Sequence, residues 1–419
     1  MRVIGKSFQP FVALVLLGLF FSPVWGAEEV KIGSINDITG ATSDVGKDYA
    51  LGIREAIQFV NDQGGVNGKT IKLYLYDYGY RIPEAITTYK RLKNFDKVIS
   101  VFGWGTGDTE SLSPIINKDK MPYVSASYSA HLTDPKKTPY NLFFSADYST
   151  NARACITAWY DEIWKKDPMY KDRVAKGEKP RFVCFYAAAV PYASAPIKAI
   201  KDQAQLLGFE VGDDQDVALT ALDTKSQVLS AAKFKPDLVW HGNTTMSVST
   251  AIRDAYAQKL GAWHIVNNWG YDENLPRLAG EAASNVVGAA PCAFFGEQVK
   301  LMDQVVAYAQ KMNPGVPKEQ RLIRTVQAWA NVLVLWEAMK RADKAGKLSG
   351  EGIMQVGFET LKEYDLGLGA PPMTFSAADH RPTTIAQVYI YKGGKFAQLQ
   401  RIDMKKRWPD KWEKEWLGW

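Results

Sequence analysis

The sequence predicts an α/β protein with two successive parallel-sheet units. Short apolar runs alternate with longer segments of helical spacing from Val30 onward, which indicates parallel strands covered by helices on both faces. The alternation restarts after Phe144, where a second series of strands and helices begins. About 390 residues follow an apolar leader, enough for two domains that each have a core.

The first series begins with an extended run and then alternates between helix and strand. Strands are expected over residues 30–35, 71–76, 98–102 and 122–125, and helices over 47–61, 83–95 and 113–118. Gly64 and Gly65 allow the positive φ at which the first helix can stop, and Asn67-Gly68 is a turn signal before the next strand. This segment is therefore one helix-to-strand step of an α/β fold.

The second series has the same alternation and leads to a tryptophan-rich tail. Helices are expected over 151–164, 193–207, 225–232, 246–259, 298–312 and 322–345, and strands over 181–186, 209–211, 238–241, 263–266, 285–290, 384–392 and 396–402, with a charged surface insert at 165–179. Trp408, Trp412 and Trp416 recur every four residues and so form one helical stripe. Such a stripe favours packing over a surface for docking a partner.

The first 26 residues have the pattern of a secretory signal peptide. Arg2 and Lys6 precede an apolar run at 11–21, and cleavage after Gly26 fits better than cleavage after Ala27. The run of about eleven apolar residues is shorter than the roughly 20 that span a bilayer, which disfavours a retained anchor. No cysteine precedes Cys155, so we expect an exported, soluble protein without a lipid anchor.

Charge and cysteine content argue against a nucleic-acid-binding protein and against a protein built on a disulfide framework. Lys and Arg exceed Asp and Glu by six, and two of these six lie in the leader. So small a surplus, spread along the chain, does not favour nucleic acid as a partner. Cys155, Cys184 and Cys292 allow at most one disulfide, so this is no disulfide-framework protein, and the thiols suit core positions.

A glycine-rich loop at 103–109 is a candidate ligand-binding segment. It joins an expected strand to an expected helix, and ligands of open parallel sheets bind beyond the carboxyl ends of the strands. Gly103, Gly105 and Gly107 let the backbone approach a ligand, while free N–H groups at a helix start favour an anion. We therefore expect a carboxylate cradle; the glycine spacing differs from that of a dinucleotide loop.

Motifs for catalysis and for metal binding are absent from the sequence. The four histidines are scattered, and there is no H-E-x-x-H, no G-x-S-x-G and no metal-ligand spacing of cysteines. Asp379-His380 is an adjacent acid–base pair, but no nucleophile motif accompanies it. A binding protein with no cofactor and no metal is therefore favoured over an enzyme.

The segment from Asn61 to Ile71 reads N-x-x-G-G-V-x-G-K-x-I, which resembles a hallmark of the periplasmic leucine/isoleucine/valine-binding proteins. These are the substrate-binding subunits of branched-chain amino-acid ABC transporters. Further resemblance lies at 33–46, 103–114, 235–239, 278–281 and 373–381, in that order along nearly the whole chain. It implies the type I periplasmic binding protein fold, with two Rossmann-like parallel-sheet lobes joined by a three-crossover hinge.

The resemblance also implies where the lobes begin and end. The crossovers would fall near Ser145, within 292–295 and near Phe375. The signal peptide would then occupy residues 1–26, the first lobe 27–145 plus 293–372, and the second lobe 146–292 plus 373–419.

A ligand site shared by both lobes is a further implication. Thr106, with Gly105 beside it, matches the loop that binds a ligand carboxylate in this family. Ser127 would offer its carbonyl to a ligand amine, and Ser129 its hydroxyl and N–H to the carboxylate. Tyr192 matches a tyrosine of the second lobe that closes over the ligand.

Several positions depart from the family pattern. Asn268 stands where the amino-acid binders have a carboxylate that neutralises the ligand ammonium, and an amide cannot neutralise a buried cation. Asp272, four residues on, is a possible substitute. Family aromatics are replaced by Val45 in the first loop and by Asn243-Thr244 after the strand at 238–241.

Aromatic residues are nevertheless frequent around the expected cleft, at Trp104, Tyr128, Tyr192, Trp269 and Tyr271. Aromatic walls suit a flat apolar ligand, and a carboxylate cradle without an ammonium partner suits a simple organic acid. The expected ligand is thus an amino acid or a related aromatic or aliphatic carboxylate.

The function implied by the resemblance is that of a periplasmic solute-binding subunit of an ABC importer. The ligand would bridge the lobes and shift an open–closed equilibrium. The closed form, a monomer, would dock on permease subunits driven by a cytoplasmic ATPase. The alternative is a protein that presents its ligand to a separate sensor.

Overall fold

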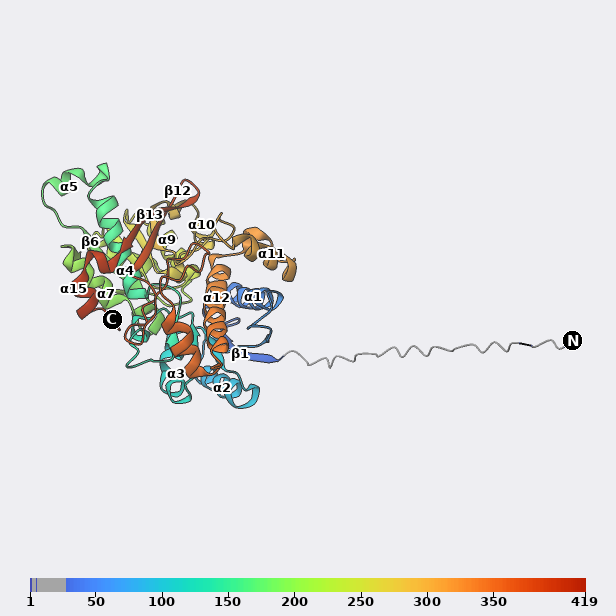
Figure 1. Cartoon of the computed structure of the whole chain (residues 1–419). Helices are drawn as coiled ribbons and strands as arrows, with labels where there is room; N and C mark the ends of the chain where they lie inside the picture. Colours follow the sequence, from blue (N-terminus) through green and yellow to red (C-terminus); the bar gives the residue numbers. More distant parts are fainter. Residues whose placement is uncertain (2–4, 6–27) are drawn as a thin grey trace.

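The computed structural model describes residues 1, 5 and 28–419, and it contains two parallel-sheet lobes with helices on their faces (Figure 1). The predicted signal peptide lies almost entirely outside the described residues. Within the described part, no helix combines the length and the apolar character needed to cross a bilayer. The predicted α/β class with two lobes is confirmed.

The sheet of the first lobe has the order β2-β1-β3-β4-β5, and all its pairings are parallel. Its strands are β1 (Glu29–Asn36), β2 (Thr70–Asp77), β3 (Ser100–Gly103), β4 (Tyr123–Ser125) and β5 (Asn141–Leu142). The helices of this lobe are α1 (Ser43–Asp62), α2 (Ile82–Arg91), α3 (Thr106–Asp119), α11 (Met302–Met312), α12 (Ile323–Lys344) and α13 (Gly350–Gly352). The long α12 packs beside α1 although nearly the whole second lobe separates them in sequence (Figure 1).

The sheet of the second lobe has the order β13-β12-β11-β10-β9-β6-β7, with β8 also pairing with β6. Its strands are β6 (Arg181–Tyr186), β7 (Glu210–Val211), β8 (Gln215–Asp216), β9 (Leu238–His241), β10 (Trp263–Val266), β11 (Val286–Ala289), β12 (Ile385–Lys392) and β13 (Lys395–Asp403). The pairings β11–β12 and β12–β13 are antiparallel, so the last two strands form a hairpin on the edge of a parallel sheet.

The helices of the second lobe include the long elements that cover its sheet and short ones in its loops. They are α4 (Tyr148–Trp159), α5 (Lys171–Ala175), α6 (Pro191–Ser194), α7 (Ile197–Leu206), α8 (Lys225–Ala232), α9 (Thr245–Ala257), α10 (Asn274–Ala279), α14 (Met404–Arg407) and α15 (Pro409–Lys414). The chain passes between the lobes after β5, after β11 and before β12, which gives the expected three crossovers.

Some element boundaries differ from the sequence-based expectation. Helix α3 begins at Thr106, seven residues before the expected 113, because Gly105 in extended backbone serves as its N-cap. The expected helix 193–207 is divided into α6 and α7, and Pro196 precedes the second of them. A proline lacks an N–H and cannot continue a helix interior, which accounts for the division.

The glycine segment that carries the family resemblance connects α1 and β2 and rests on α12. Gly64 and Gly65 have φ of +93° and +63°, as expected for the end of a helix. The indole Nε1 of Trp336 on α12 donates to the carbonyl oxygen of Gly65 at 2.7 Å, and Lys69 pairs with Asp343 at 2.9 Å. The segment therefore has a structural role within the first lobe.

The tryptophan stripe of the tail packs on the second lobe. Trp412 and Trp416 are buried, and the Arg381 guanidinium lies 3.9 Å from the centre of the Trp412 ring. The packing prediction is confirmed for these two rings.

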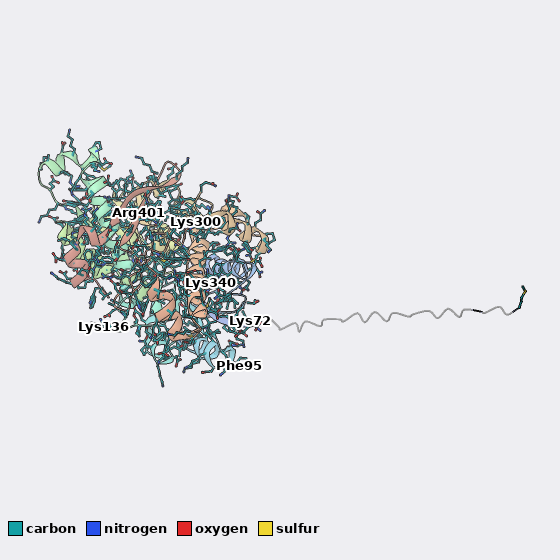
Figure 2. All side chains as sticks on the ribbon, viewed as in Figure 1. Lys72, Phe95, Lys136, Lys300, Lys340 and Arg401 are labelled. Carbon is teal, nitrogen blue, oxygen red and sulfur yellow. The ribbon has the colours of Figure 1, made fainter. Side chains whose placement is uncertain are left out.

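The three cysteines are buried free thiols. On the surface, the labelled Lys72, Lys136 and Lys300 lie on different sides of the molecule (Figure 2).

Candidate functional site

A small cavity lies where the two lobes meet. Its volume is about 20 Å³, and it is lined by Thr42, Val45, Tyr80, Trp104, Gly105, Thr106, Tyr148, Tyr192, Thr244 and Trp269. Most of these residues follow the carboxyl end of a parallel strand, where ligands of open α/β sheets bind. So small a volume holds about one water molecule. The lobes are therefore closed on one another in this structure.

The first-lobe wall of the cavity contains the residues that were predicted to form a carboxylate cradle. Gly105 caps α3, and the first N–H groups of that helix have no intrahelical partner. The hydroxyl oxygens of Thr106 and Ser127 are 2.8 Å apart, so two hydroxyls meet at the helix start. A Cβ at Gly105 would overlap the Asp108 carboxyl and the Tyr78 hydroxyl, so a larger residue here would have to displace these two side chains. Hydroxyl and N–H donors together suit a carboxylate.

Aromatic side chains from both lobes close the cavity. The rings of Trp104, in the first lobe, and Trp269, in the second, lie 4.9 Å apart between centres at 66°. The Trp104 indole N–H donates to the Thr42 hydroxyl at 2.8 Å, and the Trp269 indole N–H donates to the Tyr148 hydroxyl at 3.1 Å. Each indole is thus oriented by one hydrogen bond, and the Arg324 guanidinium lies 5.0 Å from the centre of the Trp269 ring.

Two tyrosines of the cavity have unusual surroundings. Tyr80 follows β2 and has φ of +58°, a conformation that costs energy for a residue with a side chain and is frequent at binding sites. Tyr148 begins α4 directly after the first crossover. Burial raises the pKa of both phenols, so each is a neutral hydrogen-bonding group at physiological pH.

An acid lies directly behind the cradle. The Asp108 carboxyl accepts a hydrogen bond from the Tyr78 hydroxyl at 2.9 Å, and burial raises the pKa of Asp108 to about 7. Around neutral pH this carboxyl is therefore partly protonated. Protonation lowers its repulsion of an anion bound at the start of α3.

The ten residues predicted to bind a ligand lie in three settings. Four of them line the cavity: Trp104, Gly105, Thr106 and Tyr192. Ser127 does not line it, but its hydroxyl is hydrogen-bonded to that of Thr106. The remaining five, which are Tyr128, Ser129, Asn243, Asn268 and Asp272, do not line it.

Three of these five have contacts of their own. Tyr128 is buried behind the cavity, where its ring contacts those of Tyr148 and Trp269. The Ser129 hydroxyl donates to Glu110 at 3.0 Å. The Asn243 side chain accepts the N–H of Ala187 and donates to the carbonyl of Val217, both at 2.9 Å, so it fixes loops of the second lobe.

Asp272, the possible ammonium partner, is already paired. Its carboxylate accepts from Nη2 of Arg324 on α12 at 2.9 Å and from the Thr245 hydroxyl at 2.6 Å. Arg324 also donates to the carbonyl oxygen of Asn268 at 2.8 Å, while both polar atoms of the Asn268 amide are buried without a described partner. The Asp272 carboxylate is thus already neutralised by the Arg324 guanidinium, and the Asn268 side chain is a neutral amide.

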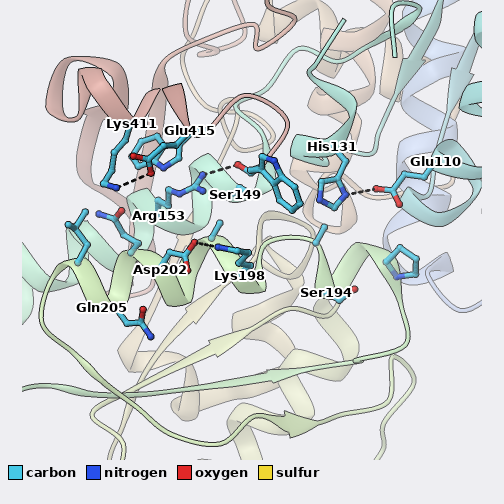
Figure 3. A pocket seen from close by; sticks show the side chains of 17 residues that line it. Glu110, His131, Ser149, Arg153, Ser194, Lys198, Asp202, Gln205, Lys411 and Glu415 are labelled. Atoms are coloured by element: carbon cyan, nitrogen blue, oxygen red, sulfur yellow. Dashed lines mark hydrogen bonds and ion pairs between the residues drawn. The ribbon is translucent and has the colours of Figure 1, made fainter. Parts of the chain in front are cut away.

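A larger groove of about 820 Å³ lies outside this cavity, between α3 of the first lobe and α4, α7 and the tail (Figure 3). Its charged side chains pair with one another, as Lys198 does with Asp202 at 2.5 Å and Lys411 with Glu415 at 3.0 Å. None of the ten predicted residues lines it. The small interlobe cavity is therefore the better candidate site.

Sequence reasoning missed Thr42, Tyr80 and Tyr148, which line the cavity, and noted Thr244 only as part of the pair that replaces a family aromatic. Thr42 and Tyr80 each follow a parallel strand, so the rule that ligands bind at carboxyl ends could have found them. Tyr148 follows a crossover between the lobes, and no motif in the sequence around it indicated a binding residue. Among residues 28–419, no group of three or more His, Cys, Asp or Glu side chains is arranged to hold a metal ion.

The family described as "Periplasmic binding protein" matches residues 29–395. A curated relative, the "Amino acid binding protein" of Pseudomonas aeruginosa, is 34% identical over 93 residues; the match covers 21% of this chain and about a quarter (25%) of the length of that relative.

Two solved structures are similar over nearly their whole length. A substrate-binding protein of an ABC transporter from Aeropyrum pernix has 30% identity and a TM-score of 0.80, over 90% of this chain and 96% of its own. A branched-chain amino acid ABC transporter protein from Thermus thermophilus, with bound valine, has 19% identity and a TM-score of 0.81, over 91% of this chain and 99% of its own. This chain therefore belongs to the periplasmic binding protein family.

Proposed function

We propose that this protein is the periplasmic solute-binding subunit of an ABC importer of the branched-chain amino-acid type. The observation that carries the proposal is the cradle at the start of α3, where the Thr106 and Ser127 hydroxyls lie 2.8 Å apart beside free helix N–H groups. It would capture the carboxylate of an amino acid or a related small acid between the lobes. The exported chain would deliver that ligand to the permease, without a catalytic step.

Ligand entry requires the lobes to separate. A cavity of about 20 Å³ cannot hold an amino acid, and the Trp104–Trp269 contact fills the space between the lobes. The Arg324–Asp272 pair links the lobes and is shielded from solvent, whereas the Asp44–Met246 contact between the lobes is exposed. The expected motion is therefore a hinge opening about the three crossovers, followed by closure on the ligand.

Binding of a simple organic acid is the second candidate. It is favoured by the neutral Asn268 amide and by the pairing of Asp272 with Arg324, which leave these two positions without a free negative charge for an ammonium. Presentation of the same ligand to a separate sensor would use the same cleft.

Ligand binding is tested by identifying the small molecules that co-purify with the protein by mass spectrometry. The unloaded protein is then titrated with branched-chain and aromatic amino acids and with aromatic and aliphatic acids. Because Trp104 and Trp269 are in contact, ligand entry should change the intrinsic fluorescence. If no compound of this panel changes the fluorescence or the melting temperature, the proposal is wrong.

The cradle is tested by Thr106→Ala and Ser127→Ala. Each variant removes a hydrogen bond to a charged group, so we expect affinity to fall about 10-fold or more. Ser111→Ala is the matched control, because the Ser111 hydroxyl donates to the Gly107 carbonyl of its own helix at 2.7 Å on an exposed face of α3. An equal loss in all three variants would exclude a specific role for the cradle.

A further inference from the structure

A carboxylate of the first lobe lies between two residues that line the cavity. Asp44, in the first turn of α1, stands between Thr42 and Val45. Its Oδ2 accepts the N–H of Met246 in α9 of the second lobe at 3.1 Å. Its Oδ1 is shielded from solvent and has no hydrogen-bond partner among the described residues. One oxygen of this carboxylate therefore spans the lobes, and the other is unused.

Thr244 presents a second unused polar atom from the opposite lobe. It is the N-cap residue of α9, and threonine in this position usually bonds its own helix. Here its side chain makes no such bond. The residue lines the cavity and is only 2% exposed, and its hydroxyl has no hydrogen bond of normal geometry within the described residues. The Thr244 hydroxyl is close enough to the Asp44 carboxyl to stabilise its charge. Asp44 of the first lobe is therefore a neighbour of a second-lobe residue that lines the cavity.

No cation of the described chain neutralises Asp44. Its charged surroundings are Asp272 and Arg324, and these two are paired with each other at 2.9 Å. Asp44 itself forms no ion pair with any residue in 28–419, and burial raises the pKa of its carboxyl to about 6. Asp44 is half-buried. A carboxylate that is partly withdrawn from water without a counter-ion is costly, and a cationic ligand group would remove that cost.

We propose that Asp44 and Thr244 bind the ammonium group of the ligand, so that the protein selects zwitterionic amino acids over acids that lack an amine. The inference rests on the proposed function, in which Thr106 and Ser127 hold the carboxylate end. An ammonium has three donors and one positive charge, which matches the negative charge of Asp44 and the acceptor lone pairs of the Thr244 hydroxyl. The negative charge that Asn268 of the second lobe cannot supply would then come from Asp44 of the first lobe.

The test compares amino acids with the acids that lack only the amine. Leucine is paired with 4-methylpentanoate and phenylalanine with 3-phenylpropanoate, and affinities are measured by calorimetry at pH 7.5. In Asp44→Asn, amino-acid affinity should fall about 10- to 100-fold, because a hydrogen-bonded charge pair is lost. The affinity for the matched acid should change less than about threefold. Thr244→Val should lower amino-acid affinity by a smaller factor.

Asp62→Asn, at the exposed far end of α1, is the control and should change neither affinity. Wild-type protein that binds the acid as tightly as the amino acid would overturn the inference and leave the proposed function intact. The same holds if Asp44→Asn and Thr244→Val weaken both compounds of a pair equally. If the wild type binds neither, the proposed function and the inference both fail.

Discussion

The buried pair between Asp272 and Arg324 offers a sharp test of how the two lobes are joined. Asp272 follows β10 in the second lobe, and Arg324 lies in the first turn of α12 in the first, with neither side chain exposed to solvent. Asp272→Asn removes one charge, keeps the shape, and leaves the guanidinium without a counter-ion. We expect this variant to be strongly destabilised.

The expected loss follows from the contacts of the pair. Breaking a buried ion pair by removal of one partner costs about 3–5 kcal/mol. Arg324 retains hydrogen bonds to the carbonyl of Asn268 and to Gln327, both at 2.8 Å, which favours the lower end, roughly 3 kcal/mol. For a lobe of this size, that loss lowers the melting temperature by about 6–12 °C.

Urea unfolding followed by circular dichroism measures this loss, with Asp202→Asn as control. Asp202 pairs with Lys198 on an exposed face of α7, so its replacement should cost no more than about 1 kcal/mol. Arg324→Gln combined with Asp272→Asn removes both charges and should recover much of the stability. The reasoning is refuted if Asp272→Asn costs no more than the control, or if the double variant loses the sum of the single losses.

Three further predictions concern pH and the tail. Burial raises the folded-state pKa of Asp108 to about 7, so its contribution to stability is full below pH ~4 and is lost as pH rises to about 7. Asp108→Asn should therefore raise the free energy of unfolding at pH 8, by up to roughly 4 kcal/mol, but should not change it at pH 4. Burial lowers the pKa of His264, which lies 2.9 Å from His241, to about 4, so wild-type stability should fall between pH 6.5 and 4, and His264→Gln should reduce that fall in acid titrations of unfolding. Trp412→Ala should cost about 3–5 kcal/mol in urea unfolding, because the ring is buried under Arg381, whereas Trp419→Ala, at a ring 54% exposed, should cost less than about 1 kcal/mol.

Local sequence was sufficient for the central strands of the second sheet. β6, β9 and β10 have the bounds expected from the sequence, because central parallel strands are continuous apolar runs between turn residues. The start of α3 was placed too late, since a run of alternate glycines reads as a loop. In the structure, Gly105 is the N-cap and the helix begins directly after it.

The candidate site was predictable only in part. Trp104, Thr106 and Tyr192 could be placed near the cleft because they follow or begin elements at the carboxyl ends of strands. The partners of Asn243 could not be foreseen, because its hydrogen bonds reach loops 25 and more residues away. Sequence spacing carries no information about such contacts.

The sequence by itself determined the two α/β lobes and the glycine segment between α1 and β2, because hydrophobic periodicity and the need for positive φ are properties of neighbouring residues. Only the tertiary structure decided which charges remain free in the cleft. Asp272 is neutralised by Arg324, 52 residues away, whereas Asp44 meets α9 across 202 residues and keeps an unused oxygen. These pairings depend on how the two sheets face one another, which no local pattern encodes.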